Sequence, residues 1–239
     1  MSTPCGTLFL IPVSLGDTAW THFLPGQAQH LTATLRHFVV ENAKTARAEL
    51  KRLEHPGPIR ELEISELPEK PDASRLDALL APALRGEDVG LMSEAGCPAV
   101  ADPGALLVAR AHEHGIPVRP LVGPSSILLA LMASGLNGQC FAFEGYLPVA
   151  EMERNTRIRG LEERSRRDRR TQIFIETPYR NERLFDALLE NCRPDTRICV
   201  ARDLTTPEEW IRTRTVQNWR QEPRPELNRR PALFLLLAS

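Results

Sequence analysis

Short apolar runs alternate with amphipathic stretches of helical length through the first half of the chain, and this alternation limits the possible folds more than any other feature of the sequence. Strands that are followed by helices build a mostly parallel sheet with right-handed crossovers. In such a sheet, ligands bind beyond the carboxyl ends of the strands. We expect strands at residues 7–13, 36–40, 59–67, 88–92 and 118–122, and helices at residues 24–35, 42–53, 74–84, 105–113 and 127–133.

The sequence changes in character after Gly135, where strand-like runs outnumber helical ones. This proportion predicts an α+β arrangement with strands of mixed direction. The expected fold class is therefore α/β with two domains, an N-terminal α/β domain at residues 1–135 and a C-terminal α+β domain at residues 136–239. The second domain is expected to have strands at residues 141–146, 171–175, 196–201, 210–216 and 232–238, and helices at residues 151–170 and 182–190.

The composition argues against several classes of protein. A formal net charge of −1 is too small for the whole molecule to attract nucleic acid, so any polyanion must meet a local basic patch. Five widely spaced cysteines form no C-x-x-C pair, which argues against a zinc site or a disulfide framework and suits a reducing compartment. The N-terminal residues lack a signal-peptide pattern and residues 232–238 are too short to span a bilayer, so we expect a cytoplasmic location and no membrane contact.

Common catalytic and phosphate-binding motifs are missing from the sequence. It contains no G-x-G-x-x-G, no G-x-x-x-x-G-K-[ST], no H-E-x-x-H and no G-x-S-x-G. His112 and His114 are two apart on an expected helix end, so they point to different faces and are interpreted as surface residues. We therefore predict no metal site.

Three loops that follow expected strands carry the candidate chemistry. Residues 93–104 crowd proline, glycine and small side chains into a wall of backbone acceptors, which suits a ligand with a sulfonium and an adenine. The alternative is a tight strand-to-helix loop, with Asp102 as the helix cap and Pro103 as the first helical residue. Ser125 or Ser126 either caps the next helix or binds a ligand carboxylate at its N-terminus.

Two charged segments in the second half also allow two interpretations each. Glu176 and Arg180 form either a plain surface ion pair or the flank of a bound cation and an anionic acceptor. The arginine-rich run at residues 164–170 is either a solvated helix end or a phosphate contact with RNA. Glu162 and Glu163 stand four residues before Arg166 and Arg167, so helical salt bridges explain part of this run.

Seven segments, in order along the chain, together resemble the tetrapyrrole methylase family, the class III S-adenosylmethionine-dependent methyltransferases. Within it, the sequence is most similar to the 16S ribosomal RNA 2′-O-cytidine methyltransferase branch. The resemblance runs along almost the full length and is more specific than any single motif. The segments are residues 6–16 (first strand and turn), 93–104 (S-D-A-G-T-P…S-D-P-G), 123–125 (P-G-P-S), 133–136 (S-A-S-G-L), 143–148 (F-E-G-F-L-P), 176–180 (E-S-P-H-R) and 202–205 (R-E-L-T).

The resemblance implies S-adenosylmethionine folded into a cleft between the two domains, within a homodimer, and held mainly by backbone. It implies a transferase that acts on RNA, at a ribose 2′-hydroxyl, in ribosomal RNA processing. Position by position, the implied cofactor-binding residues are Leu15, Gly96, Cys97, Val100, Ser125, Ser126, Glu176, Ala201 and Ala232. As catalytic residues we expect Glu94 and Glu176 to line the cleft, and Arg180 and Arg202 to contact phosphate.

The departures from the family pattern fall mainly on the acceptor side. Glu41-Asn42-Ala43-Lys44 replaces E-D-T-R, Tyr179 replaces a histidine, Thr206 replaces a lysine, and Glu94 replaces an aspartate. Three functions therefore remain open: an RNA methyltransferase, a small-molecule C-methylase of the tetrapyrrole type, and a non-catalytic protein that binds S-adenosylmethionine or RNA.

Overall fold

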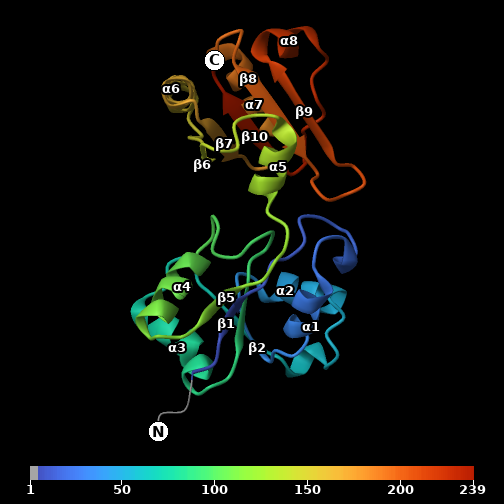
Figure 1. Ribbon diagram of the computed structural model, residues 1–239, viewed down its shortest axis with the longest axis vertical. Helices are drawn as coiled ribbons and strands as arrows, with labels where there is room; N and C mark the ends of the chain where they lie inside the picture. Colours follow the sequence, from blue (N-terminus) through green and yellow to red (C-terminus); the bar gives the residue numbers. More distant parts are fainter. Residues whose placement is uncertain (1–4) are drawn as a thin grey trace. The chain divides into compact units, whose positions relative to one another are not determined.

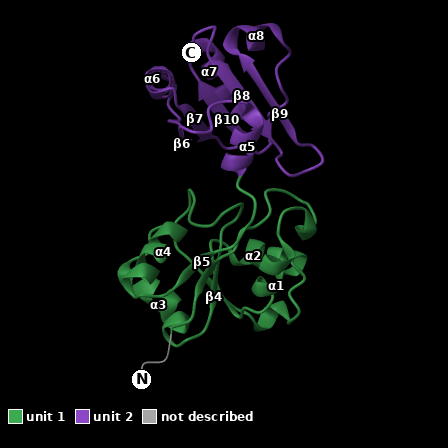
Figure 2. Cartoon of the chain, in the orientation of Figure 1, with its two compact units in different colours: residues 1–125 green, residues 126–239 purple. Residues whose placement is uncertain are grey.

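The computed structural model describes residues 5–239 and divides them into two compact units, at residues 1–125 and 126–239 (Figure 2). Residues 1–4, which belong to the stretch examined for a signal peptide, lie outside the described part. The division falls ten residues before the boundary that the sequence suggests at residue 135, because the helix over residues 126–134 packs on the sheet of the second unit. Each unit has its own sheet, so each is described separately below.

Unit 1 contains a sheet in which every strand pairs in parallel, as the alternating sequence predicts. Within the described residues the sheet has five strands in the order β3-β2-β4-β1-β5. Because the strands are parallel, the loops that follow them leave at one edge. The strands are β1 (Leu8–Leu10), β2 (His37–Val40), β3 (Glu63–Glu66), β4 (Val89–Met92) and β5 (Val118–Pro120).

Helices cover both faces of this sheet (Figure 1). On one face α3 (Ala73–Leu84) and α4 (Gly104–Glu113) share a core with Leu8 and Leu91, and on the other α2 (Ala43–Arg52) shares a core with Ile11 and Phe38. The inner strands β1, β2 and β4 are therefore mainly buried and apolar, whereas the edge strands β3 and β5 are largely exposed and carry charged residues. The remaining elements of the unit are α1 (Gly26–Thr32) and two 3₁₀ turns, η1 (Trp20–His22) and η2 (Ile59–Glu61).

Unit 2 contains a mixed sheet, as the sequence also predicts. Among residues 126–239 the strand order is β6-β7-β10-β8-β9, in which β6 and β7 are parallel and the other pairs are antiparallel. Ala232 pairs with Arg202, and Leu233 pairs with both Ala201 and Ile175. The strands are β6 (Phe141–Tyr146), β7 (Thr171–Ile175), β8 (Arg197–Arg202), β9 (Trp210–Thr215) and β10 (Ala232–Leu237).

Three of the four helices of unit 2 share a core with the sheet, and this core includes Trp219. Its ring packs edge-on against Phe185, and its indole nitrogen donates to the Ile198 carbonyl at 2.9 Å. This bond satisfies the one polar atom of a fully buried side chain. The helices are α5 (Ser126–Ser134), α6 (Glu151–Asp168), α7 (Asn181–Asn191) and α8 (Val216–Gln221).

Among the differences from the sequence expectations are two in which an element was divided or missed. Residues 59–67 were expected to be one strand, but the backbone first makes the turn η2 and then the short strand β3. Helix α8 follows β9 directly and was not expected; Thr215 caps it by accepting from the backbone N–H of Asn218. Both errors concern segments of a few residues, for which periodicity gives little signal.

Gly90 lies where β4 crosses the core, and a Cβ there would sit 2.6 Å from Ile11 Cδ1 and 3.0 Å from Phe38 Cδ1. We predict that Gly90→Ala lowers the free energy of unfolding by about 1–3 kcal/mol, because the added methyl group overpacks the core. Gly26→Ala is the control, since nothing lies within 4 Å of a Cβ at that position. Urea unfolding measures both variants, and equal stability of Gly90→Ala and wild type would contradict the packing described here.

Candidate functional site

Hydrogen bonds connect three of the loops at the carboxyl edge of the unit 1 sheet. The backbone N–H of Val13, after β1, donates to the Gly96 carbonyl at 2.9 Å, after β4. The Cys97 thiol donates to the carbonyl of Pro124, after β5, at a sulfur–oxygen distance of 3.3 Å. Gly96 has a φ of +71°, a conformation that glycine adopts without strain. The predicted residues Gly96 and Cys97 therefore join the loops after β1, β4 and β5.

Helix α2 fixes the loop that contains Leu15. Glu49 is buried and accepts from the backbone N–H and the hydroxyl of Ser14, at 3.1 and 3.2 Å. Arg52 donates to the Ser14 hydroxyl at 2.8 Å and to the Gly16 carbonyl at 2.9 Å. These contacts surround a cavity of about 290 Å³ that Leu15, Glu94 and Ala95 also line. The sequence did not point to Glu49 or Arg52 as site residues. The charged side chains of a helix do not show by themselves which loop they will contact.

Carboxylates gather at the same edge. Glu41, directly after β2, accepts from the backbone N–H of Glu94 at 2.8 Å. Burial raises the pKa of Glu41 above its ordinary value, the Glu94 bond opposes this, and the negative charges of Asp102 and Glu94 raise the pKa further. Burial also raises the pKa of Asp102, against the effect of its backbone hydrogen bonds. Burial, the main cause of both shifts, disfavours the ionised form of each carboxyl group, whereas the negative charges of Asp102 and Glu94 favour a cation near Glu41.

Asp102 organises the loop between β4 and α4. Its Oδ1 accepts from the backbone N–H groups of Ala99, at 3.0 Å, and Gly104, at 2.7 Å. The sequence predicts Pro103 as the first helical residue, but α4 begins at Gly104, so Asp102 caps the helix from one position further away. A Cβ at residue 104 would lie 2.7 Å from this oxygen, which explains the glycine.

The same loop holds backbone strain and an unsatisfied atom. Ala99 and Ala101 have φ values of +66° and +65°, which cost a residue with a side chain about 1–3 kcal/mol each. The second carboxylate oxygen of Asp102 is buried and has no hydrogen-bond partner among the described residues. A buried acceptor without a partner is itself costly and is available to a ligand donor.

The predicted residues of unit 2 lie at the edge where β7 and β8 end and β10 begins. Glu176 follows β7 and is 7 % exposed; its Oε1 accepts from Arg180 Nη2 at 2.5 Å and from the Thr177 backbone N–H at 2.7 Å. Ala201, Arg202 and Ala232 are neighbours by strand register. The register therefore brings Ala201, Arg202 and Ala232 together at the edge where Glu176 and Arg180 lie.

Arg202 is more constrained than a free phosphate-binding side chain. It pairs with Asp203 at 2.6 Å, and its guanidinium lies 5.5 Å from the centre of the Trp210 ring. Asp203 also pairs with Arg230 at 2.9 Å. The side chain of Arg202 is 15 % exposed, against 30 % for Arg180. Of the two predicted arginines, Arg180 therefore has the more accessible guanidinium.

Neither helical salt bridge that the sequence suggests for the arginine-rich run forms among the described residues. Glu162 faces inward instead, where it accepts from the Arg193 backbone N–H at 2.7 Å and from the Thr196 hydroxyl. Arg167 pairs with Asp168 at 2.8 Å. The expectation for Glu162 is therefore wrong, because the Arg193 backbone N–H, 31 residues away, and the buried Thr196 hydroxyl occupy the same carboxylate.

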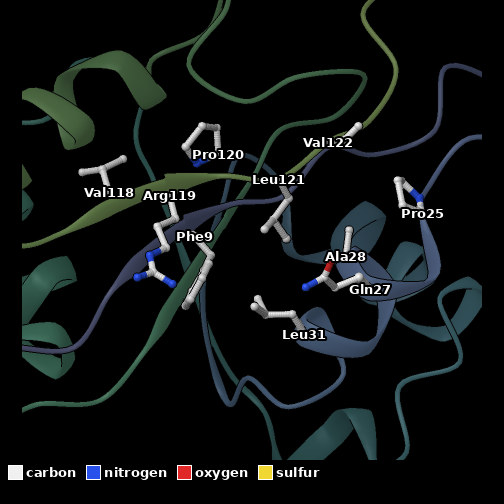
Figure 3. A pocket seen from close by; sticks show the side chains of 10 residues that line it. All are labelled: Phe9, Pro25, Gln27, Ala28, Leu31, Val118, Arg119, Pro120, Leu121 and Val122. Carbon is white, nitrogen blue, oxygen red and sulfur yellow. The ribbon is translucent and has the colours of Figure 1, made fainter.

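A larger cavity, of about 380 Å³, lies beside the edge strand β5 and helix α1. Figure 3 shows Phe9, Leu31 and Leu121 pointing toward this common space. Its lining is mainly apolar and includes none of the carboxylates described above. This cavity is larger than the one beside Leu15, but its lining lacks the carboxylates, so we do not assign the candidate site to it. Within residues 5–239, no three histidine, cysteine or acidic side chains form a group that could hold a metal ion.

The family model of the tetrapyrrole (corrin/porphyrin) methylases matches residues 25–219. The chain belongs to this family. The membership confirms the predicted class of enzyme, a methyltransferase that depends on S-adenosylmethionine. The identification rests on most of the chain and on both units.

Curated relatives are similar to the chain over different lengths. One is "Ribosomal RNA small subunit methyltransferase I" of Xylella fastidiosa, which is 30% identical over all of this chain and 83% of the relative. A relative of the same name from Mesorhizobium japonicum is 40% identical over 58% of this chain and 46% of its own length. A crystal structure of the methyltransferase CobJ has a TM-score of 0.62 at 21% identity, covering 98% of this chain and 95% of that chain. This last likeness confirms the fold.

The residues of unit 1 fit part of such a cofactor. The three carboxylates suit a positively charged sulfonium, and the orphaned oxygen of Asp102 suits a donor. Gly96, Ala99 and Ala101 carry little or no side chain of their own, so the backbone groups of this loop are less covered than those of larger residues. Leu15, Gly96, Cys97 and Val100 belong to the loops that present these features.

We predict that Asp102→Ala lowers the free energy of unfolding by about 2–4 kcal/mol, because at least two backbone N–H groups lose their acceptor. Asp102→Asn keeps a carbonyl oxygen in place of Oδ1, so its loss is expected to be smaller. Urea unfolding compares the two variants with wild type. Equal losses for alanine and asparagine would show that Oδ1 does not hold the loop.

We predict that Glu41→Gln changes the pH dependence of stability. A carboxyl group with a raised pKa in the folded chain binds its proton more tightly when folded, so wild type loses stability as pH rises from the ordinary glutamate value through the raised one. Glutamine keeps the acceptor for Glu94 and does not ionise. The melting temperature of the variant relative to wild type should therefore rise between pH 4 and pH 7. A difference that stays constant over this range would contradict the raised pKa.

Proposed function

We propose that the chain transfers a methyl group from S-adenosylmethionine to RNA, at a ribose 2′-hydroxyl of the small ribosomal subunit. The observation that carries this proposal is the alignment of the whole chain with the Xylella fastidiosa relative, whose name is that of a ribosomal RNA methyltransferase. The ordered motifs of the 2′-O-methyltransferase branch support the same acceptor. The solved neighbours are 19–22% identical and support the fold alone.

The proposed cofactor contacts are the residues that the family pattern implies. Bound S-adenosylmethionine supplies a methyl group on a sulfonium, ready for in-line displacement. Around it, the chain contributes loops that are already rigid, so little conformational entropy is lost on binding. The proposed contacts in unit 1 are Leu15, Gly96, Cys97, Val100 and Ser125, and those in unit 2 are Ser126, Glu176, Ala201 and Ala232.

Glu94 is the proposed general base. Its backbone N–H is held by Glu41, whereas its side chain is exposed at the carboxyl edge of the sheet. An exposed carboxylate on a fixed backbone is able to accept the proton of a ribose hydroxyl that enters this edge. Glu41 and Asp102 are already engaged with backbone N–H groups, so they support Glu94 and do not compete with it.

Glu176 and Arg180 are proposed to line the acceptor side in unit 2. Glu176 holds Arg180 in place, and the accessible part of the guanidinium contacts phosphate. Arg202 makes a weaker contact, because Asp203 and Trp210 already fix it. Exposed arginines of the run at residues 164–170 add sequence-independent phosphate attraction.

Assembly and location complete the proposal. We propose a homodimer, as the family resemblance implies, acting in the cytoplasm where ribosomal RNA is processed. Within the described residues, no helix has both the length and the apolar character needed to cross a membrane.

Methyl transfer from radiolabelled S-adenosylmethionine tests the proposal. We expect label in undermethylated small ribosomal subunits. Label in a porphyrinogen instead would support a C-methylase, and cofactor binding by calorimetry without transfer to either would support a non-catalytic protein. Either result would contradict an RNA methyltransferase.

We predict that Glu94→Gln lowers kcat by about a hundredfold or more, because the variant cannot accept a proton. Calorimetry should show unchanged affinity for S-adenosylmethionine. Glu61→Gln is the matched control, since Glu61 is exposed on η2, which precedes the amino end of β3. Unchanged turnover of Glu94→Gln would remove this residue as the base.

A further inference from the structure

Tyr179 exposes a large aromatic ring to water. It is 77 % exposed, in the loop that follows β7, between the predicted site residues Glu176 and Arg180. An exposed ring of this size costs free energy in the isolated chain, because its faces are hydrated. Neither the cofactor contacts nor the proton transfer proposed above uses this ring.

Hydrogen bonds to backbone groups hold the loop that carries Tyr179. The backbone N–H of Arg180 donates to the Thr177 carbonyl at 2.9 Å, and the N–H of Thr177 donates to the buried Glu176 at 2.7 Å. The ring therefore stands on a fixed turn. A group that packs on it has little loop entropy to overcome.

Arg229 lies beside this ring. Its guanidinium is 5.9 Å from the centre of the Tyr179 ring, and its backbone N–H donates to the Pro178 carbonyl at 3.1 Å. Arg229 has a φ of +59°, a left-handed conformation that is strained for a residue with a side chain. A backbone hydrogen bond thus joins the loop after β7 to the loop before β10. Arg229, the residue with the strained backbone, places its guanidinium over the Tyr179 ring.

Arg229 differs from the neighbouring arginines in having no carboxylate partner among the described residues. Arg180 and Arg230 each pair with a carboxylate, at 2.5 and 2.9 Å. Within residues 5–239, no carboxylate lies within ion-pair distance of Arg229, whose side chain is exposed. An exposed arginine without a carboxylate partner retains its full capacity to bind an anion.

We propose that Tyr179 and Arg229 form a nucleotide-binding platform for the RNA acceptor. An unpaired base stacks on the Tyr179 ring, and Arg229 contacts the phosphate beside that base. Every base has a flat π-face, and an arginine next to a stacking aromatic residue is the arrangement that suits single-stranded nucleic acid. The inference rests on the proposed function, and it identifies the acceptor segment as unstacked RNA instead of a duplex.

Two substitutions of Tyr179 test the stacking. Tyr179→Phe keeps the ring, so we expect RNA affinity within about twofold of wild type. Tyr179→Leu keeps apolar bulk without a ring, and we expect about tenfold weaker binding, within the usual range for loss of one base stack. The probes are a short fluorescein-labelled single-stranded oligoribonucleotide and undermethylated small ribosomal subunits, and calorimetry should show unchanged affinity for S-adenosylmethionine.

Arg229→Ala tests the phosphate contact through the salt dependence of binding. Loss of one phosphate contact should reduce the slope of log affinity against log salt by roughly 0.7, the value for a single strand. Arg60→Ala is the charge-matched control, because Arg60 is 87 % exposed on η2, ahead of the amino end of β3. The control should leave the slope unchanged.

The outcomes separate the two proposals. If wild type methylates small subunits and Tyr179→Leu does so with the same KM and the same RNA affinity, the platform is wrong and the proposed function stands. If wild type neither binds nor methylates RNA, the proposed function fails and the platform fails with it. A weakened Tyr179→Leu, a normal Tyr179→Phe and a reduced slope for Arg229→Ala together support the platform.

Discussion

The structure of the candidate site depends on the parallel pairing of the strands in unit 1. Parallel pairing places the loops that follow all these strands at one edge, whatever their separation in sequence. Direct bonds then join three of the loops: Val13 bonds to Gly96, and Cys97 bonds to Pro124. The first of these bonds joins two backbone groups, and most other contacts of the site join one side chain to a backbone group. The chain departs from the family pattern at residues 42–44 and at Glu94, and the Glu94 backbone N–H still donates to Glu41, which matches the pattern.

The loop after β4 shows what this geometry costs. Two alanines adopt left-handed conformations, and Asp102 is buried with one oxygen unsatisfied. A loop shaped only for stability would be expected to use glycine at both alanine positions and to solvate or pair the carboxylate. The same loop contains Glu94, and the nearby Glu41 has a raised pKa caused first by burial. Strain, buried charge and accessible carboxylate coincide at one edge, and such coincidence is typical of functional sites.

Some arginines of unit 2 are paired with carboxylates, and others are free to bind phosphate. Arg202 and Arg230 share Asp203, which fixes them near the ends of β8 and β10, whereas Glu176 holds Arg180 and leaves 30 % of its side chain exposed. Arg229 stands beside them without a carboxylate and next to an exposed ring. Counting arginines in the sequence therefore overstates the number that are free to bind phosphate, since a buried or paired guanidinium has already lost much of its capacity.

The sequence by itself determined the order and type of nearly all elements, the parallel and mixed sheets and the family, because periodicity and ordered motifs are local signals that survive along one chain. It also indicated that Glu94, Gly96 and Cys97 would lie at a strand end. Only the tertiary structure decided which partners the charged residues have. Glu49 reaches Ser14, Glu162 turns inward to Arg193, and Arg229 lies over Tyr179, in each case across 30 residues or more. Such contacts depend on which elements fold side by side, and no local pattern encodes that.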